Sequence, residues 1–291
     1  IIAAVPTLGR VMALTRNESC VHERKGVYGK LGGGAHVGLI VGDDIDLRIF
    51  FTAWRFGFAI AEETKQGPRR SLQFFDAQGV AIHKIYLTDT SDVAVFEALA
   101  ANWATEASPI VAEAAAMRAA PPADSAVDVA GFQSAWDALK DTHEFHGLLT
   151  KFKLPRLQAL RLAGERRARG VDTASLRNIL TAAGQSGTPI MVFVGNPGMI
   201  QIHTGPVKEL KAMGPWFNVL DDSFNLHLRE DRVASAFVVW KPTDDGVVTS
   251  LELFDAEGEL IASLFGKRKP GQAEDEAWRA LVAGLLTKEA A

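Results

Sequence analysis

The sequence of 291 residues contains one cysteine, Cys20, which excludes an internal disulfide framework and a cysteine-based zinc site. It also lacks an excess of basic residues. Its formal net charge is −4, whereas non-specific nucleic-acid binding needs a basic surface. No apolar run approaches the length of about 18 residues that a membrane-spanning helix needs, and residues 1–10 lack the features of a signal peptide. These absences predict a cytoplasmic protein with no membrane span and no nucleic-acid partner.

Several common catalytic signatures are missing as well. The glycines at 32–34 lack the spacing and the lysine of a P-loop, and neither a dinucleotide-binding glycine motif nor a Gly-x-Ser-x-Gly motif is present. The segment His143-Glu-Phe-His146 is one residue shorter than the zinc protease helix motif, and no third ligand is evident. We therefore expect the glycines at 32–34 to lie in a hairpin loop and Cys20 to be a strand residue.

An internal repeat organises the chain. Residues 11–82 align without a gap with residues 190–261, and the clearest match is Ser71-Leu-Gln-Phe-Phe-Asp-Ala-Gln-Gly79 with Ser250-Leu-Glu-Leu-Phe-Asp-Ala-Glu-Gly258. Strand patterns dominate both copies, and each match contains a glycine at the bend of an expected hairpin. The sequence thus predicts an α+β fold that duplicates an antiparallel-sheet unit with flanking helices.

Helical patterns fill the remainder, at residues 91–105, 131–152, 156–169, 173–184 and 274–288. We predict a first repeat at 1–113, an Ala/Pro-rich linker at 114–130 and a second repeat at 131–291. Three helices precede the second sheet but not the first, and there is no initiator methionine. We therefore expect the intact protein to carry a further helical segment before residue 1.

The predicted helix at 131–152 contains the most informative side chains. At spacings of three and four residues, one stripe of this helix presents Phe132, Trp136, Leu139, His143 and His146. A histidine on such a stripe is either a core residue or a ligand presented into a pocket.

Cationic residues form a second group of candidates. Arg48 lies on the expected strand 46–51, on the same face as Phe50, and the repeat places His227 at the equivalent position. Arg156, Lys241 and residues 267–269 are cationic positions of the second half. These cations either lie on a solvated face or converge on an anion.

The sequence resembles the bacterial hemin-degrading, or HemS-type heme-utilisation, proteins. The matching segments cover nearly the whole chain and are Val11–Asn17, Asp44–Phe50, Ser71–Asp76, Asp141–Phe145, Phe152–Leu160, Phe224–Arg229 and Phe265–Gly271. This resemblance implies that the protein binds heme, as its ligand and as a possible substrate.

The resemblance also implies a role for individual residues. His143 matches the proximal heme-iron ligand, and Arg48 matches a catalytic arginine on the distal side, with Phe50 beside it. Arg156, Lys241 and Arg268 match cations near the heme propionates. Neutral imidazole is a suitable axial ligand for heme iron, whereas arginine stays protonated and can only donate hydrogen bonds.

Three functions therefore remain open. The first is a cytoplasmic protein of iron acquisition that promotes heme degradation with an external electron donor. The second is a non-enzymatic chaperone that delivers intact heme to a separate heme oxygenase. The third is a scaffold that binds no heme. The resemblance does not decide whether the protein is an enzyme or whether it forms a homodimer. His22 and His83 are expected to be strand residues.

Overall fold

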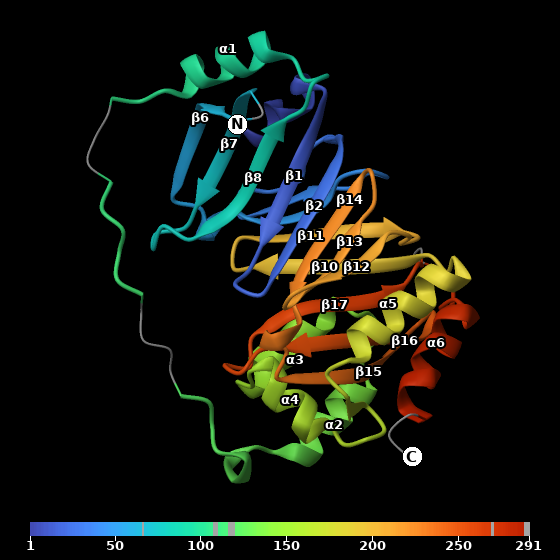
Figure 1. Cartoon of the computed structure of the whole chain (residues 1–291). Coiled ribbons are helices and arrows are strands. Elements are labelled where there is room, and N and C mark those ends of the chain that lie inside the picture. Colours follow the sequence, from blue (N-terminus) through green and yellow to red (C-terminus); the bar gives the residue numbers. More distant parts are fainter. Residues whose placement is uncertain (66, 107–109, 116–119, 269–270, 288–291) are drawn as a thin grey trace. The chain divides into compact units, whose positions relative to one another are not determined.

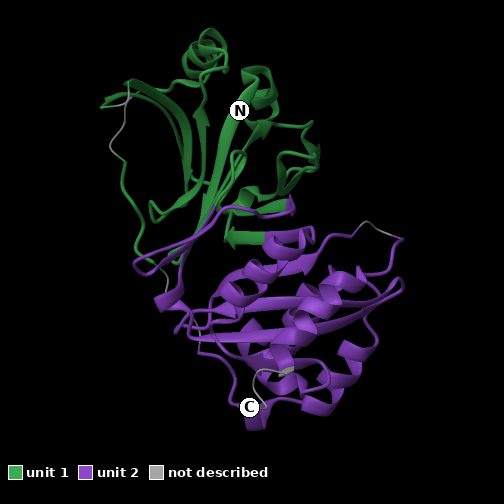
Figure 2. Cartoon of the chain, turned by 45° about the vertical axis from the view of Figure 1, so that its right-hand side comes forward, with its two compact units in different colours: residues 1–116, 193–203, 220–227 green, residues 117–192, 204–219, 228–291 purple. Residues whose placement is uncertain are grey.

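The computed structural model describes residues 1–65, 67–106, 110–115, 120–268 and 271–287 (Figure 1). Their strands form two antiparallel sheets, of eight and nine strands. The chain divides into two compact units (Figure 2). Unit 1 comprises residues 1–116, 193–203 and 220–227, and unit 2 comprises residues 117–192, 204–219 and 228–291. The units thus differ from the sequence repeats, because two segments of the second repeat belong to unit 1.

Unit 1 is built mainly of strands. Its elements, including the larger parts of β11 and β14, are η1 (Ile2–Leu8), β1 (Arg10–Arg16), β2 (Cys20–Val27), β3 (Gly32–Gly33), β4 (Val37–Ile40), β5 (Asp46–Phe50), η2 (Phe51–Ala53), β6 (Phe56–Thr64), β7 (Gly67–Phe75), β8 (Ala81–Leu87), α1 (Val93–Trp103), β11 (Met199–Gly205) and β14 (Phe224–Arg229). One set of strands has the order β14-β2-β1-β8-β7-β6, and another has the order β3-β4-β5-β11. The hydrophobic core of unit 1 includes Val11, Leu47, Ile49, Phe74 and Ile85.

Unit 2 combines a sheet with helices. Its elements, with β10 reaching into unit 1, are η3 (Asp124–Ala126), α2 (Val129–Asp137), α3 (Glu144–Phe152), α4 (Arg156–Ala163), β9 (Ala168–Val171), α5 (Ser175–Ser186), β10 (Ile190–Asn196), β12 (Leu210–Met213), β13 (Trp216–Leu220), η4 (Glu230–Arg232), β15 (Ser235–Thr243), β16 (Gly246–Phe254), β17 (Leu260–Gly266) and α6 (Glu276–Thr287). The order of the main strands is β10-β17-β16-β15-β9. The helices α2, α3 and α4 pack against β15 and β16 around Phe132, Trp136, Val239 and Phe254 (Figure 1).

The two predicted hairpins are confirmed and are closely equivalent. β7 pairs with β8 and β16 pairs with β17, and the register shifts at Phe74/Phe75 in one hairpin and at Leu253/Phe254 in the other, which are equivalent positions of the repeat. Gly79 and Gly258 follow the turns with φ values of 79° and 81°, a conformation that glycine adopts without strain. The duplicated sheet unit is therefore confirmed.

Two helix predictions are wrong in detail. The predicted helix at 131–152 is broken into α2 and α3, so His143 does not continue the stripe of Phe132 and Trp136. The helix predicted at 156–169 ends at Ala163, because residues 168–171 pair as β9 with residues 236–239 of β15. Residues 116–119 of the predicted linker and residue 288 of the last predicted helix lie outside the described residues.

The hairpin predicted at residues 32–34 is present, but only Gly34 lies in its loop, because Gly32 and Gly33 form strand β3 and pair with β4. Cys20 is a buried, free thiol at the start of β2, as expected of a strand residue. His22 and His83 are buried residues of β2 and β8, as expected of strand residues.

Candidate functional site

His143 lies at the start of α3, where the carboxylates of Asp141 and Glu144 accept hydrogen bonds from backbone amides. The side chain of Asp141 accepts a hydrogen bond from the His143 amide at 2.8 Å. The side chain of Glu144 accepts hydrogen bonds from the amides of Lys140 and Asp141 at 2.9 and 3.4 Å. These two side chains satisfy amides that have no partner within the helix, so they favour a new helix start over a continuous helix. The spacing Asp-x-x-Glu resembles a capping box and could have predicted this break.

The same Asp141 carboxylate orients the imidazole of His143. The ring Nδ1 lies 2.5 Å from Asp141 Oδ1. A carboxylate only accepts hydrogen bonds when ionised, so Nδ1 carries the proton and a neutral ring has its lone pair on Nε2. The hydrogen bond from the His143 amide, together with the His143 ring and Arg268, holds the pKa of Asp141 below its ordinary value although burial opposes this.

The His143 side chain is open to solvent. It is 86% exposed, which excludes the interpretation of His143 as a core residue and leaves Nε2 accessible to a ligand. His146 is also exposed, on the first turns of α3. In contrast, Phe132 and Trp136 on α2 and Leu139 just after it are buried, so the predicted stripe separates into these core residues and two exposed histidines.

Arg268 belongs to the surroundings of the His143 loop. Its charge acts on Asp141, and its guanidinium lies 3.8 Å from Asp245, in the turn between β15 and β16. The neighbouring Asp244 amide donates a hydrogen bond to the Lys140 carbonyl at 2.9 Å, which ties this turn to the loop before α3. The structure therefore places Arg268 near the loop that carries His143, and the sequence analysis had selected both residues.

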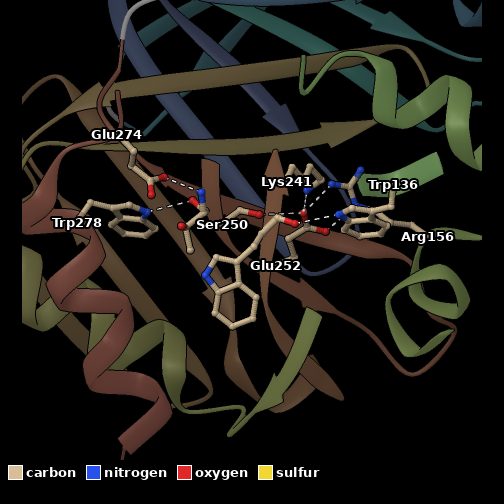
Figure 3. A network of polar contacts seen from close by, with 9 residues as sticks. Trp136, Arg156, Lys241, Ser250, Glu252, Glu274 and Trp278 are labelled. Carbon is tan, nitrogen blue, oxygen red and sulfur yellow. Dashed lines mark hydrogen bonds and ion pairs between the residues drawn. The ribbon is translucent and has the colours of Figure 1, made fainter. Parts of the chain in front are cut away.

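Arg156 and Lys241 are held by a buried carboxylate, Glu252, as Figure 3 shows. Arg156 donates two hydrogen bonds to Glu252, at 2.7 and 2.8 Å, and Lys241 donates one at 2.8 Å. Both cations lie over the ring of Phe145, at 5.0 and 4.6 Å from its centroid. The sequence analysis missed Glu252, because the pairing joins β16 to β15 and α4. A sequence signal was present in the repeat, because Glu252 is charged where the first repeat has the neutral Gln73.

Arg48 lies in unit 1, in the middle of β5. Asp46, Arg48 and Phe50 are half-buried on one face of this strand, while Leu47 and Ile49 are buried on the other face. Arg48 pairs with Asp46, and burial raises the pKa of Asp46 although the Arg48 charge opposes this.

The neighbours of Arg48 on the adjacent strands are apolar. Leu39 on β4 and Ile200 on β11 lie directly across from Arg48. Residues directly opposite one another on antiparallel strands share a face, so Arg48 pairs with Asp46 on its own strand and has an apolar neighbour on each adjacent strand. Such apolar neighbours suit one side of a flat, apolar ligand.

Other features of the described residues limit the type of site. No group of three or more histidine, cysteine, aspartate or glutamate side chains in the described part of the chain could hold a metal ion. Heme iron needs only one axial ligand from the protein, so this finding is compatible with His143 as that ligand. A surface cavity of about 500 Å³ is lined by Arg161, Arg169 and Phe237, and it includes none of the predicted site residues. None of the helices between residues 1 and 287 that the structure describes is long and apolar enough to cross a bilayer.

The chain is similar to proteins of known family. The model of the Haemin-degrading HemS.ChuX domain matches residues 1–103 and 153–285. The hemin transport protein HmuS of Yersinia pestis is 40% identical over 297 residues, which cover 100% of this chain and 84% of HmuS. The hemin transport protein HemS of Yersinia enterocolitica is 41% identical over 302 residues, with the same coverage.

Solved structures agree with these sequence comparisons. The structure of holo-PhuS, a heme-binding protein from Pseudomonas aeruginosa, has a TM-score of 0.95 and 50% sequence identity, and the match covers 98% of this chain and 83% of PhuS. The structure of ChuS, an Escherichia coli heme oxygenase, has a TM-score of 0.90 and 39% identity over 98% of this chain and 85% of ChuS. The chain therefore belongs to the haemin-degrading HemS/ChuX family.

Proposed function

We propose that this protein binds heme, with His143 as the iron ligand, and promotes heme degradation in the cytoplasm as part of heme utilisation. The observation that carries the proposal is the exposed His143 imidazole whose Nδ1 is held by Asp141. A carboxylate on the far nitrogen fixes the tautomer and the ring orientation of a metal-binding histidine and raises its basicity. The names of the relatives, which describe hemin transport, heme binding and heme oxygenase activity, support this function.

The other predicted residues have complementary tasks in the proposal. Arg268, near the His143 loop, supplies a cation for a propionate, since a guanidinium recognises carboxylates with paired donors. Arg48 would be the catalytic residue that donates a hydrogen bond at the bound heme, and Phe50 and Leu39 would supply apolar contacts to it. When bound, heme supplies the redox chemistry of its iron, and the electrons come from an external donor.

A hemin titration followed by visible absorption tests the iron ligand. We expect a saturable Soret shift at one equivalent for the wild type, and its loss or displacement in His143→Ala. His146→Ala is the matched control, because His146 is also exposed but pairs with no carboxylate among the residues that the structure describes. If His143→Ala keeps the wild-type spectrum, His143 is not the ligand. If the wild type shows no saturable binding, the heme function is wrong.

Turnover distinguishes degradation from heme delivery. With a reductant and oxygen, the proposed activity converts the hemin complex to an opened tetrapyrrole and free iron, and Arg48→Ala slows this conversion while hemin still binds. A protein that only delivers heme instead passes intact hemin to an added acceptor protein and leaves the Soret band unbleached.

A further inference from the structure

Glu252 is a buried carboxylate with a complete set of hydrogen-bond donors. Its side chain is 0% exposed, and it accepts hydrogen bonds from Arg156 Nε and Nη2, Lys241 Nζ and Ser250 Oγ (Figure 3). Burial opposes its ionisation, but the adjacent Arg156 and Lys241 outweigh this and hold the pKa of Glu252 well below its ordinary value. The cluster therefore contains two cations and one carboxylate.

The cluster of Arg156, Lys241 and Glu252 has a net charge of +1, because two cations share one carboxylate. Lys241 is 3% exposed and Glu252 is fully buried, whereas the Arg156 side chain is 29% exposed. Only the guanidinium can therefore meet a ligand. Its Nε and Nη2 are occupied by Glu252, and no described residue accepts a hydrogen bond from Nη1. A guanidinium that is fixed along one edge and free on the other is prepared to receive a further carboxylate.

In the first repeat, the sheet forms with a neutral residue at the position equivalent to Glu252. Gln73 occupies the position equivalent to Glu252, 179 residues earlier, and its amide donates a hydrogen bond to Ser71, the equivalent of Ser250. A neutral side chain therefore satisfies the same strand position. The ionised form occurs in the repeat that carries His143 and Phe145, and Phe145 lies against both cations.

We propose that Glu252 is a positioning residue for ligand recognition, which holds the guanidinium of Arg156 so that its free edge receives one carboxylate of the ligand. Lys241 balances the charge of Glu252 and leaves Arg156 for the ligand. The inference rests on the proposed function, in which that carboxylate is a heme propionate.

The test compares hemin with hemin dimethyl ester, in which both carboxylates are masked, in the same cosolvent. The wild type is expected to bind hemin roughly tenfold more tightly than the ester, the effect of one charge-assisted hydrogen-bonded contact. The double variant Lys241→Met/Glu252→Gln keeps the net charge of the cluster but removes the carboxylate that holds Arg156. Replacing both members of a buried ion pair is often tolerated, and circular dichroism and thermal melting confirm the fold.

The expected result is that the double variant loses most of the preference for hemin over the ester while its affinity for the ester is unchanged. Arg166→Gln, which removes a largely exposed cation of unit 2, is the charge control and keeps the preference. If the double variant unfolds, Glu252→Asp retains the charge, withdraws the carboxylate by one methylene and is expected to lose the same preference.

Two results would overturn the inference. One is an unchanged preference in a folded Glu252 variant. The other is a wild type that binds hemin through His143 but does not distinguish it from the ester. A wild type that binds neither compound contradicts the proposed function itself, so the two failures can be told apart.

Discussion

The substitution His22→Leu removes a buried imidazole from the interior of unit 1. His22 lies on β2 with 0% exposure, and its ring is 5.0 Å from that of Phe224. Neither ring nitrogen has a hydrogen-bond partner among the described residues. A buried polar group without a partner costs about 1–3 kcal/mol, and leucine is similar in size to histidine. We expect His22→Leu to raise the free energy of unfolding of unit 1 by about 1–3 kcal/mol at pH 7.

The substitution His22→Leu should also change how the stability of unit 1 depends on pH. Burial, His203 and Arg24 lower the pKa of His22 well below 6.5, and burial lowers the pKa of His83 to about 3. The unfolded chain therefore binds more protons below about pH 6.5, so stability falls as the pH decreases from there. Each histidine contributes about 1.4 kcal/mol per pH unit between the two pKa values. His22→Leu should remove one of these two contributions.

Hydrogen exchange of the β1 and β2 amides at pH 7, 6 and 5 measures the stability of unit 1 directly. His36→Leu is the matched control, because His36 is exposed and its replacement should leave the stability at pH 7 unchanged. The reasoning is refuted if His22→Leu is less stable than the wild type at pH 7. It is also refuted if the variant loses stability with falling pH as steeply as the wild type does.

Three further predictions concern unit 2. Asp141→Ala should shift the His143 ring from the Nδ1–H tautomer toward a mixture, detected by ¹⁵N chemical shifts, and weaken hemin binding about tenfold; an unchanged tautomer would contradict the role of Asp141. Trp136→Phe removes the donor to the Trp240 carbonyl and should cost about 1–3 kcal/mol in urea unfolding; an unchanged midpoint would show that this carbonyl finds another donor. The ionised Glu252 stabilises unit 2 above about pH 4.5, and this stability is lost only as the pH falls toward its lowered folded pKa. Hydrogen exchange on β16 should therefore stay protected at pH 5, where unit 1 has already weakened.

Local patterns predicted the two hairpins and some of the strands, and comparison of the sequence with itself revealed the repeat. The alternation of polar and apolar residues at 46–50 indicates a strand that buries one face. The turns at Gly79 and Gly258 are indicated by a glycine three residues after an aspartate. Each of these strand and turn patterns spans only a few residues, so it can be recognised without knowledge of the rest of the chain. The same holds for Arg48 and Phe50, whose shared face follows from the period of the strand.

The helix before His143 shows where local patterns mislead. The spacing of Phe132, Trp136 and His143 fits one helical stripe, but Asp141 and Glu144 cap a new helix between them. Side-chain hydrogen bonds to the backbone compete with helix continuation, and periodicity does not measure this competition. His143 is therefore exposed, although its spacing in the sequence predicted that it shares a helix face with core residues.

The sequence by itself determined the duplicated α+β unit and the family, because both are recognised by matching residues position by position, without knowledge of any tertiary contact. The heme-binding roles of individual residues stay predictions. Only the tertiary structure decided which side chains meet. The pairing of residues 168–171 with β15 turned a predicted helix into a strand. The packing of α3 and α4 on β15 and β16 buried Glu252 between Arg156 and Lys241. Such contacts join residues up to 96 positions apart, and their energies exist only after the chain has folded.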